Sequence, residues 1–261
     1  MKFTMLPEPW DHTVTEVEAE GHQFVRDLDQ AEFLIFTGGP DDYPELPENI
    51  RWVQFTFAGI DAIRASGKLL PDGPRYSNAS GTYGKPVAES SLALLLAVLH
   101  QHKTVTLAKS FDCRDEVLET TDWLHGGKTV ALIGAGGIAK EMIPMLRPFN
   151  TKIIAVNNSG RTIEGADETY PMDQAAEVFA EADIFVVLLP LTGQTHHFFD
   201  AELFSRMKPG AVIINAGRGG LINTDDLVVA LKSGQLGGAG LDVTDPEPLP
   251  DGHPSGRCRM W

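Results

Sequence analysis

The amino-acid sequence predicts an α/β fold whose larger part is a doubly wound parallel sheet. After Gly127, five short runs rich in β-branched residues follow one another, and segments with helical patterning lie between them. Strands that alternate with helices form parallel sheets that helices cover on both faces. A glycine-rich turn directly follows the first of these strands, which is typical of a nucleotide-binding domain.

Composition and charge exclude several classes of protein. A chain of 261 residues with 43% hydrophobic residues is long enough to form two domains. Its net charge of −15 argues against a nucleic-acid partner and against binding to an anionic membrane. The longest apolar run, Leu92–Leu99, is too short to span a bilayer. Two cysteines, Cys113 and Cys258, make no disulfide framework, so we expect a reducing, cytoplasmic location.

The first part of the chain is rich in proline and glycine. Two apolar runs, "FLIF" (Phe33–Phe36) and "WVQFTF" (Trp52–Phe57), read as strands that end in tight loops. One long helix is expected from Pro86 to Lys109. Further along, either Asn223 or Thr224 caps a helix. The strands expected after Gly127 lie in "KTVALIG", "KIIAVN", "DIFVVLLP", "GAVIINAG" and "GAGLDV".

The glycine-rich turn in "VALIGAGGIAKEM" fits the pattern G-x-G-x-x-G/A at Gly134, Gly136 and Ala139. The first glycine permits a tight turn and the second lets a pyrophosphate approach the backbone. The alanine lets helix and strand pack closely. The helix N-terminus then faces the anion. The alternative is a turn selected only for close packing. Pro144 falls inside the predicted helix and is expected to kink or shorten it.

The second strand ends at Asn157, where a site specific for NAD usually has an acid that binds the ribose hydroxyls. Asn157 is neutral, and Arg161 follows shortly after it. Arg161 can face a 2′-phosphate, which favours NADP. It can equally be a solvated loop charge, so the choice between NADP and NAD stays open.

An arginine and an acid follow two later strands. Arg218 ends the strand in "GAVIINAGRGG", and ligands of open α/β sheets bind at such strand ends. Arginine captures carboxylates in a bidentate manner. Glu247 follows the next strand, between two prolines that stiffen its loop. Taken alone, Arg218 is equally well explained as a structural ion pair, and Glu247 as a solvated charge.

Together these stretches resemble one family, the D-isomer-specific 2-hydroxyacid dehydrogenases, with its hydroxypyruvate/glyoxylate reductase and phosphoglycerate-dehydrogenase-like members. The matching stretches are "VAES", "GAGGIA", "LPLTGQT", "MKPGAVIINAGRGGLIN" and "GLDVTDPEPLP". The resemblance implies a Rossmann nucleotide-binding domain with a smaller, flavodoxin-like substrate domain. The expected boundaries are 1–95 for the substrate domain, 96–254 for the nucleotide-binding domain and 255–261 for an aberrant tail.

The resemblance also implies an activity and a set of site residues. Family members reduce a small 2-oxo acid of the glyoxylate or hydroxypyruvate type with NADH or NADPH, and they form homodimers. Arg218 would hold the carboxylate and carbonyl oxygen of the substrate, and Glu247 would pair with a catalytic histidine and raise its pKa. The backbone of Ala58, Gly59 and Ile60 would cradle the substrate carboxylate. The implied cofactor-binding residues are Gly134, Gly136, Gly137, Ile138, Asn157, Arg161, Pro190, Thr195, Ala216 and Asp242.

The proton donor that this chemistry needs is missing from the sequence. In the family it is the histidine of a "TPH" stretch, and no such stretch occurs here. His196 and His197 suggest a metal pair, but adjacent side chains at a helix start are expected to diverge and no third ligand is apparent. We therefore expect no metal site and interpret this pair, and His253, as structural.

The last residues, "SGRCRMW", do not fit the family pattern. They can be encoded by bases that, in a neighbouring frame, read Leu-Trp-Ala-Met-Pro-Asp-Val, a continuation typical of the family. The hypothesis is a one-base deletion after Pro254. It implies loss of the last strand, the catalytic histidine and the C-terminal helix, and little turnover. The alternative function is a non-catalytic dinucleotide-binding or corepressor-like module.

Overall fold

The computed structural model describes residues 1–254, and the chain forms two compact units. Unit 1 comprises Met1–Tyr83, and unit 2 begins at Gly84. The division falls ahead of the expected boundary after residue 95, because helix α3 (Gly84–Leu99) buries Ala88 and Leu95 in the core of unit 2. The expected aberrant tail, 255–261, lies outside the described residues.

Unit 1 is built on a five-stranded parallel sheet in the order β2-β1-β3-β4-β5. This is the flavodoxin-like strand order, so the predicted fold of the smaller domain is confirmed. Apolar side chains fill both faces of the sheet. The elements are β1 (Lys2–Leu6), α1 (Asp11–Ala19), β2 (Gln23–Phe24), the 3₁₀ turn η1 (Leu28–Gln30), β3 (Phe33–Phe36), β4 (Trp52–Phe55), α2 (Asp61–Ala65) and β5 (Arg75–Ser77).

Unit 2 is built on a six-stranded parallel sheet in the order β11-β10-β9-β6-β7-β8. Numbered within the unit, this is the order 3-2-1-4-5-6 of dinucleotide-binding domains, read from its other edge. The doubly wound sheet predicted from the sequence is therefore confirmed. Its strands are β6 (Thr129–Ile133), β7 (Lys152–Asn157), β8 (Glu168–Pro171), β9 (Ile184–Val187), β10 (Ala211–Asn215) and β11 (Leu236–Leu241).

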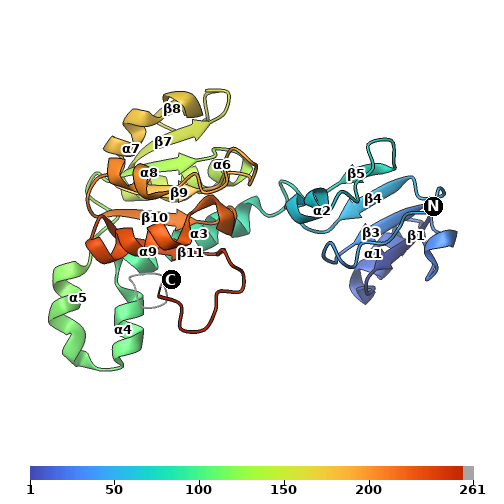
Figure 1. Cartoon of the computed structure of the whole chain (residues 1–261), viewed down its shortest axis with the longest axis horizontal. Helices are drawn as coiled ribbons and strands as arrows, with labels where there is room; N and C mark the ends of the chain where they lie inside the picture. Colours follow the sequence, from blue (N-terminus) through green and yellow to red (C-terminus); the bar gives the residue numbers. More distant parts are fainter. Residues whose placement is uncertain (255–261) are drawn as a thin grey trace. The chain divides into compact units, whose positions relative to one another are not determined.

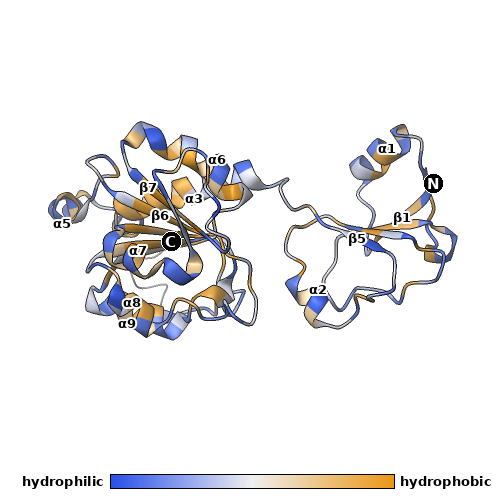
Figure 2. Cartoon of the chain, turned by 90° about the horizontal axis from the view of Figure 1, so that it is seen from above, coloured by the Kyte–Doolittle hydropathy of each residue, from blue (hydrophilic) through white to orange (hydrophobic). Residues whose placement is uncertain are grey.

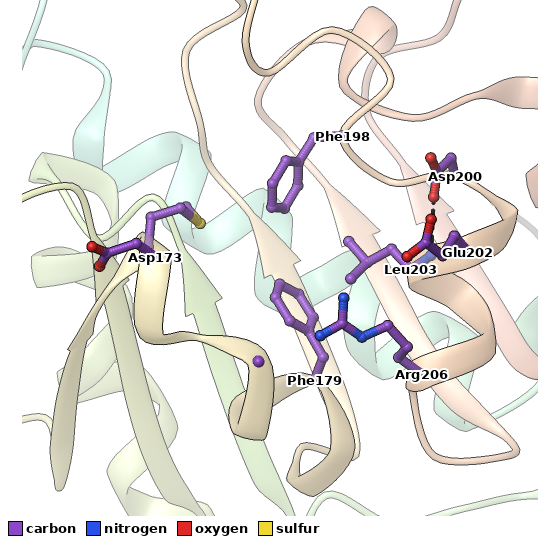
Figure 3. Close-up of a pocket in the computed structure, with 9 residues that line it drawn as sticks. Asp173, Phe179, Phe198, Asp200, Glu202, Leu203 and Arg206 are labelled. Atoms are coloured by element: carbon purple, nitrogen blue, oxygen red, sulfur yellow. Dashed lines mark hydrogen bonds between the residues drawn. The ribbon is translucent and has the colours of Figure 1, made fainter.

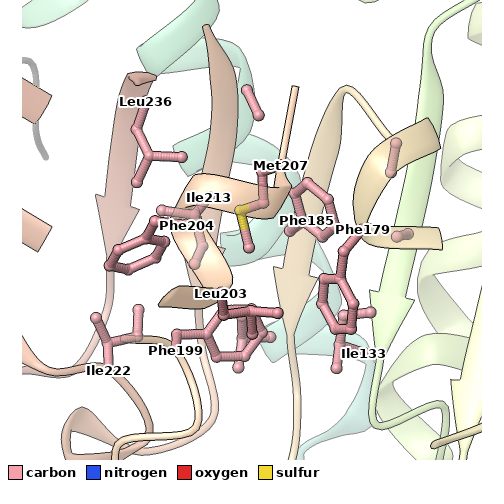
Figure 4. Close-up of a cluster of buried hydrophobic side chains, with 14 of the residues drawn as sticks. Ile133, Phe179, Phe185, Phe199, Leu203, Phe204, Met207, Ile213, Ile222 and Leu236 are labelled. Carbon is pink, nitrogen blue, oxygen red and sulfur yellow. The ribbon is translucent and has the colours of Figure 1, made fainter. Parts of the chain in front are cut away.

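Helices cover both faces of this sheet, as its fully buried central strands β6, β9 and β10 require (Figures 1 and 2). Helices α3 and α6 (Gly137–Leu146) pack on one face. Helices α7 (Ala176–Glu181), α8 (Ala201–Arg206) and α9 (Thr224–Ser233) pack on the other, where Phe185 and Phe204 are among the largest buried side chains (Figure 4). Short 3₁₀ turns lie at η2 (Phe111–Cys113), η3 (Arg147–Phe149), η4 (Met172–Gln174) and η5 (Gly219–Leu221).

The helix expected from Pro86 to Lys109 is two helices. Helix α3 ends at Leu99, Gln101 has a left-handed backbone with φ 55°, and α4 runs from His102 to Ala108. The Gln101 side chain is buried and donates to the carbonyls of Val98 and Thr120. Thr120, the last residue of α5 (Arg114–Thr120), therefore helps to stabilise the break. The sequence around Gln101 gives no signal of this distant partner.

Pro144 lies in α6, which continues to Leu146 before a 3₁₀ turn. Asn223 caps α9, since its side chain accepts from the amide of Asp226. Strand β11 lies at one edge of the described sheet. The sequence predicts a further strand beside β11. That strand would follow residue 254, outside the described residues, so it stays a prediction. No helix among residues 1–254 is both long and apolar enough to cross a membrane.

A carboxylate ties the end of α6 to strands β7 and β8. Asp167 accepts from the Ile153 amide at 2.7 Å and pairs with Arg147 at 3.0 Å. Burial alone would raise the pKa of Asp167, but the amide and the guanidinium together lower it. A carboxyl group whose pKa is lowered by folding stabilises the folded state at pH values above its pKa in the unfolded chain. This stabilisation is lost as the pH falls through the pKa of the folded state.

We expect Asp167→Asn to lower the free energy of unfolding by about 1 kcal/mol at pH 7. The difference from the unaltered chain should shrink as pH falls below about 4, where the carboxyl is protonated. Urea titrations followed by circular dichroism at several pH values measure it. Glu119→Gln, an exposed carboxylate on α5, is the control. A difference that is constant from pH 7 to pH 3 would contradict this assignment.

Candidate functional site

The glycine-rich turn directly follows β6. Gly134 has φ 96°, and a Cβ there would lie 2.7 Å from the backbone of Leu188 and Leu189. Its amide and that of Ala135 both donate to the carbonyl of Val156 on the next strand. The turn is therefore fastened to the carboxyl ends of both neighbouring strands, and only glycine fits its first position.

The space above the turn is open where a ligand has to approach. A Cβ on Gly136 would meet only the Gly134 carbonyl, at 3.8 Å, and one on Gly137 would meet nothing within 4 Å. Helix α6 begins at Gly137, so the amides of its first turn, Ile138 included, lack acceptors within the helix. Ala139 is fully buried, as close packing of helix and strand requires. The chain's own residues thus fit the pyrophosphate of a dinucleotide.

Arg218 lies at the same rim of the sheet. Strands β6, β9 and β10 are adjacent and parallel, so Gly134 after β6 and Arg218 after β10 both follow carboxyl ends. Strands β6 and β10 are two strand spacings, or about 10 Å, apart in the sheet. A Cβ on Gly219 would lie 1.9 Å from the carbonyl oxygen of Thr244, and one on Gly217 would lie 2.9 Å from that of Leu189. The glycines that flank Arg218 are therefore required by backbone packing on both sides.

Asn215 is a site residue that the sequence reasoning missed. Its side chain is 1% exposed, accepts from the Gly217 amide at 3.1 Å and donates to the Arg218 carbonyl at 2.9 Å. It fixes the backbone that carries the guanidinium, which is half-buried. The available signal was an amide side chain at the end of the buried strand "AVIIN".

Asn157 lies at the carboxyl end of β7, but its side chain is used within its own loop. Its Nδ2 donates to the Arg161 carbonyl, and its Oδ1 accepts from the amide and hydroxyl of Ser159. Arg161 lines a cavity of about 580 Å³ together with Lys140 and Arg147. Glu164 also lines this cavity, and Arg147 is paired with Asp167, so Lys140 and Arg161 are the cations there that form no ion pair within residues 1–254.

The other expected cofactor residues lie at the same rim. Pro190 and Thr195 belong to the loop after β9, where the Thr195 hydroxyl donates to the Pro190 carbonyl at 2.7 Å. Ala216 follows β10. Asp242 follows β11, and its amide donates to the Asn215 carbonyl. All ten residues expected to bind the cofactor therefore lie at or beyond the carboxyl ends of β6, β7, β9, β10 and β11.

Glu247 and the expected substrate-binding residues occupy loops. The Glu247 carboxylate is exposed and, within residues 1–254, forms no hydrogen bond or ion pair, so its expected histidine partner is not among the described contacts. In unit 1, Ala58, Gly59 and Ile60 follow β4 and precede α2. Their three amides donate to no acceptor in the described chain. Such orphan donors can bind an anion.

The expectation that His196 and His197 diverge is wrong. Their rings stack with centroids 3.9 Å apart and an interplanar angle of 29°. The reason is the backbone of His197, which is left-handed with φ 51° rather than helical. Asp245, which the sequence reasoning did not associate with them, lies beside His197, with Nε2 and Oδ2 3.8 Å apart.

A second cavity, of about 320 Å³, lies between α7 and α8 (Figure 3). Phe179 and Phe198 form its apolar side, and the Arg206 side chain extends toward Phe179. None of the expected site residues lines it. It is therefore distinct from the group of residues expected to bind the cofactor and the substrate.

Comparison with known proteins agrees with this geometry. Residues 92–259 match the NAD binding domain of the D-isomer specific 2-hydroxyacid dehydrogenases. The chain is 53% identical over 254 residues to an uncharacterized protein in the proB 3′ region of Corynebacterium melassecola, covering 97% of this chain and 83% of that protein. It is 30% identical over 234 residues to glyoxylate/hydroxypyruvate reductase B of Yersinia pestis, covering 85% of this chain and 70% of that protein.

A solved structure shows the same fold. The probable 2-hydroxyacid dehydrogenase from Rhizobium etli, in complex with NADP, superposes with a TM-score of 0.77 at 25% identity, over 100% of this chain and 86% of that one. The family match extends over more than half of the chain, and it includes the glycine-rich turn and Arg218. The chain therefore belongs to the D-isomer-specific 2-hydroxyacid dehydrogenase family and carries that family's NAD-binding domain.

Proposed function

We propose that this chain binds NAD(P)H and a small 2-oxo acid of the glyoxylate or hydroxypyruvate type, and that its reaction is reduction of the oxo group to a 2-hydroxy acid. One observation carries the proposal: an open, glycine-lined helix N-terminus and a half-buried arginine occupy the same rim of one sheet, two strands apart. The dinucleotide supplies the hydride. The chain's own groups bind and orient the 2-oxo acid.

The role of Arg218 follows from its chemistry. A guanidinium presents donors in a fixed fork that matches a carboxylate and an adjacent carbonyl oxygen. Negative charge develops on that oxygen during reduction, and a donor held in place by Asn215 stabilises it without reorganisation. The same proposal assigns the substrate carboxylate to the orphan amides of Ala58, Gly59 and Ile60.

Protonation of the oxygen limits this chain. A general acid has to lie within hydrogen-bond reach of the oxygen, and Glu247 is expected to orient it. The sequence contains eight histidines, all at positions up to 253, and none of them pairs with Glu247 in the described structure. Because no histidine pairs with Glu247 among residues 1–254, we propose that the described part of the chain binds both ligands and lacks the proton donor that rapid turnover needs.

A second candidate function, a non-catalytic dinucleotide-binding or corepressor-like module, rests on the same missing donor. The two differ in a variant that carries the family's "TPH" continuation, because only the reductase gains turnover there. The proposed cytoplasmic location rests on the cysteine usage alone.

The first test measures 2-oxo acid binding through Arg218. Oxamate, a non-reducible analogue, is titrated into the chain saturated with NADPH, and cofactor fluorescence is followed. We expect Arg218→Gln to weaken oxamate by about 1.5–3 kcal/mol, or roughly 10- to 150-fold in Kd, because a charge-assisted bond is lost. Arg218→Lys should restore part of the affinity. Oxamate binding unchanged in Arg218→Gln would refute the role, and rapid glyoxylate reduction by the unaltered chain would refute the proposed impairment.

The second test concerns cofactor preference. If Arg161 faces a 2′-phosphate, Arg161→Ala should raise the Kd of NADPH about tenfold and leave that of NADH nearly unchanged. Fluorescence titration with both cofactors measures the two constants. Arg114→Ala, an exposed arginine on α5 that pairs with Asp115, is the matched control. Equal weakening of both cofactors would instead make Arg161 a structural residue of its loop.

The third test concerns the proposed homodimer. The segment from α4 to Trp123 projects from the sheet of unit 2 (Figure 1) and exposes large apolar side chains, among them Leu107 at 69%, Phe111 at 81% and Leu118 at 62%. Patches of this kind mark protein interfaces. We expect a dimer in sedimentation velocity, and Phe111→Asp should shift it toward monomer. Val229→Asp, at an exposed apolar position on α9, should not. A monomeric unaltered chain would refute the proposal.

A further inference from the structure

Three potential metal ligands from two loops converge at the carboxyl rim of unit 2. His196 and His197 follow the loop after β9, and Asp245 follows β11. One ligand atom of each residue lies within 4.8 Å of the other two. Among residues 1–254, this is the group of histidine, cysteine and acidic side chains that satisfies such a limit. The sequence predicted a structural role for the histidine pair and no metal site, and the proposed reductase function does not use these residues.

Backbone contacts hold both loops in place independently of these side chains. Thr192 and Thr195 form a turn with reciprocal hydrogen bonds directly before His196. The His197 amide donates to the Gly220 carbonyl at 2.8 Å. On the other side, the Asp245 carbonyl accepts from the Thr224 hydroxyl at 2.6 Å. The cluster is therefore preorganised, because the backbone of each ligand is positioned without the metal.

The ligand set selects a class of cation. Two imidazole nitrogens with one carboxylate oxygen match a zinc site with three protein ligands and an open position for water. Imidazole favours zinc, copper, nickel and iron over magnesium and calcium. Ligands about 2.0–2.1 Å from a tetrahedral ion lie about 3.4 Å from one another. The distance of 3.8 Å between His197 Nε2 and Asp245 Oδ2 needs little change to reach this. The stacked rings of His196 and His197 must rotate out of their stack, because each imidazole binds a metal in its own ring plane, and the exposed His196 side chain is the one that can turn.

From this arrangement we propose that His196, His197 and Asp245 form a binding site for a divalent first-row transition metal, with Zn²⁺ as the reference ion. Half-exposed side chains leave an entry path: His197 is 38% and Asp245 48% exposed. The inference rests on these three residues and their loops, and it stands or fails independently of turnover and of cofactor binding.

The position of the site gives the metal a consequence for the neighbouring turn. The carbonyl of Thr244, next to Asp245, packs against Gly219, and the His197 amide is bonded to Gly220. A bound ion would therefore join the two loops that contact the turn after Arg218. It would also restrain the loop that carries Glu247, two residues beyond Asp245. The ion would thus hold the two loops together beside Arg218, a consequence for substrate binding only if the proposed function holds.

Isothermal titration of Zn²⁺ into the metal-free chain tests the proposal. We expect one site per chain. Its affinity for zinc should fall at least about tenfold in His196→Gln and in Asp245→Asn, because the loss of a group that only orients a metal ligand already costs that much. His102→Gln is the matched control. It removes one ring of the His100–His102 pair, whose centroids lie 5.8 Å apart and which has no third ligand among residues 1–254, and it should leave the site intact. Circular dichroism in metal-free buffer checks that each variant is folded.

A second readout reports the coordination itself. Co²⁺ in a four-coordinate site with nitrogen and oxygen ligands gives visible absorption bands, which should appear in the unaltered chain and in His102→Gln and be absent in His196→Gln. Zn²⁺ should also raise the melting temperature of the unaltered chain, since it binds only the folded state. The proposal is overturned if the unaltered chain binds no zinc at micromolar concentration, or if His196→Gln and Asp245→Asn bind it as tightly as His102→Gln does.

Discussion

The close approach of Gly134 to the backbone of Leu188 and Leu189 is the constraint on which the nucleotide-binding unit depends. It brings the turn after β6 into contact with the end of β9, and the neighbouring contact of Gly217 with Leu189 does the same from β10. These two contacts draw three loops together at one rim. Because the strands are parallel, every loop that follows a strand is available at that rim, and the other rim has only loops that lead into strands. The placement of cofactor and substrate groups is thus a consequence of backbone packing.

The parts of this architecture that follow from local pattern were predictable. Buried strands with both faces covered read as continuous apolar runs, so "FLIF" and "IFVV" are recognisable without any context. Strand β8 is different, because "ETYP" lies at the sheet edge, carries half-buried polar residues and ends in proline. Its pairing with β7 appears only in the structure, where Lys152 of β7 forms an ion pair with Glu168 of β8 at 2.8 Å. The break at Gln101 was also unpredictable, since one partner of that side chain is nineteen residues away.

The candidate site divides in the same way. Gly134, Gly136 and Arg218 were predictable because turn geometry and strand ends demand particular residue types there. Asn215 was not predictable. Its side chain accepts a hydrogen bond from the Gly217 amide and donates one to the Arg218 carbonyl, and only the folded turn brings these groups together. The His196–His197–Asp245 cluster shows the limit most clearly. Spacing rules assume regular backbone, and a single left-handed residue, His197, places two adjacent rings on the same side.

Binding and chemistry are carried by different physical features in this chain. Anion binding needs only oriented donors, which the N-terminus of helix α6 and the amides of Ala58–Ile60 offer despite a net charge of −15. Local fields at such sites decide affinity because solvent and salt screen the distant acids. Proton transfer instead needs one group at one place, within hydrogen-bond reach of a single oxygen. A fold can therefore retain ligand binding without the reaction. The exposed carboxylate of Glu247, which has no histidine partner among residues 1–254, is where the proposed function separates the two.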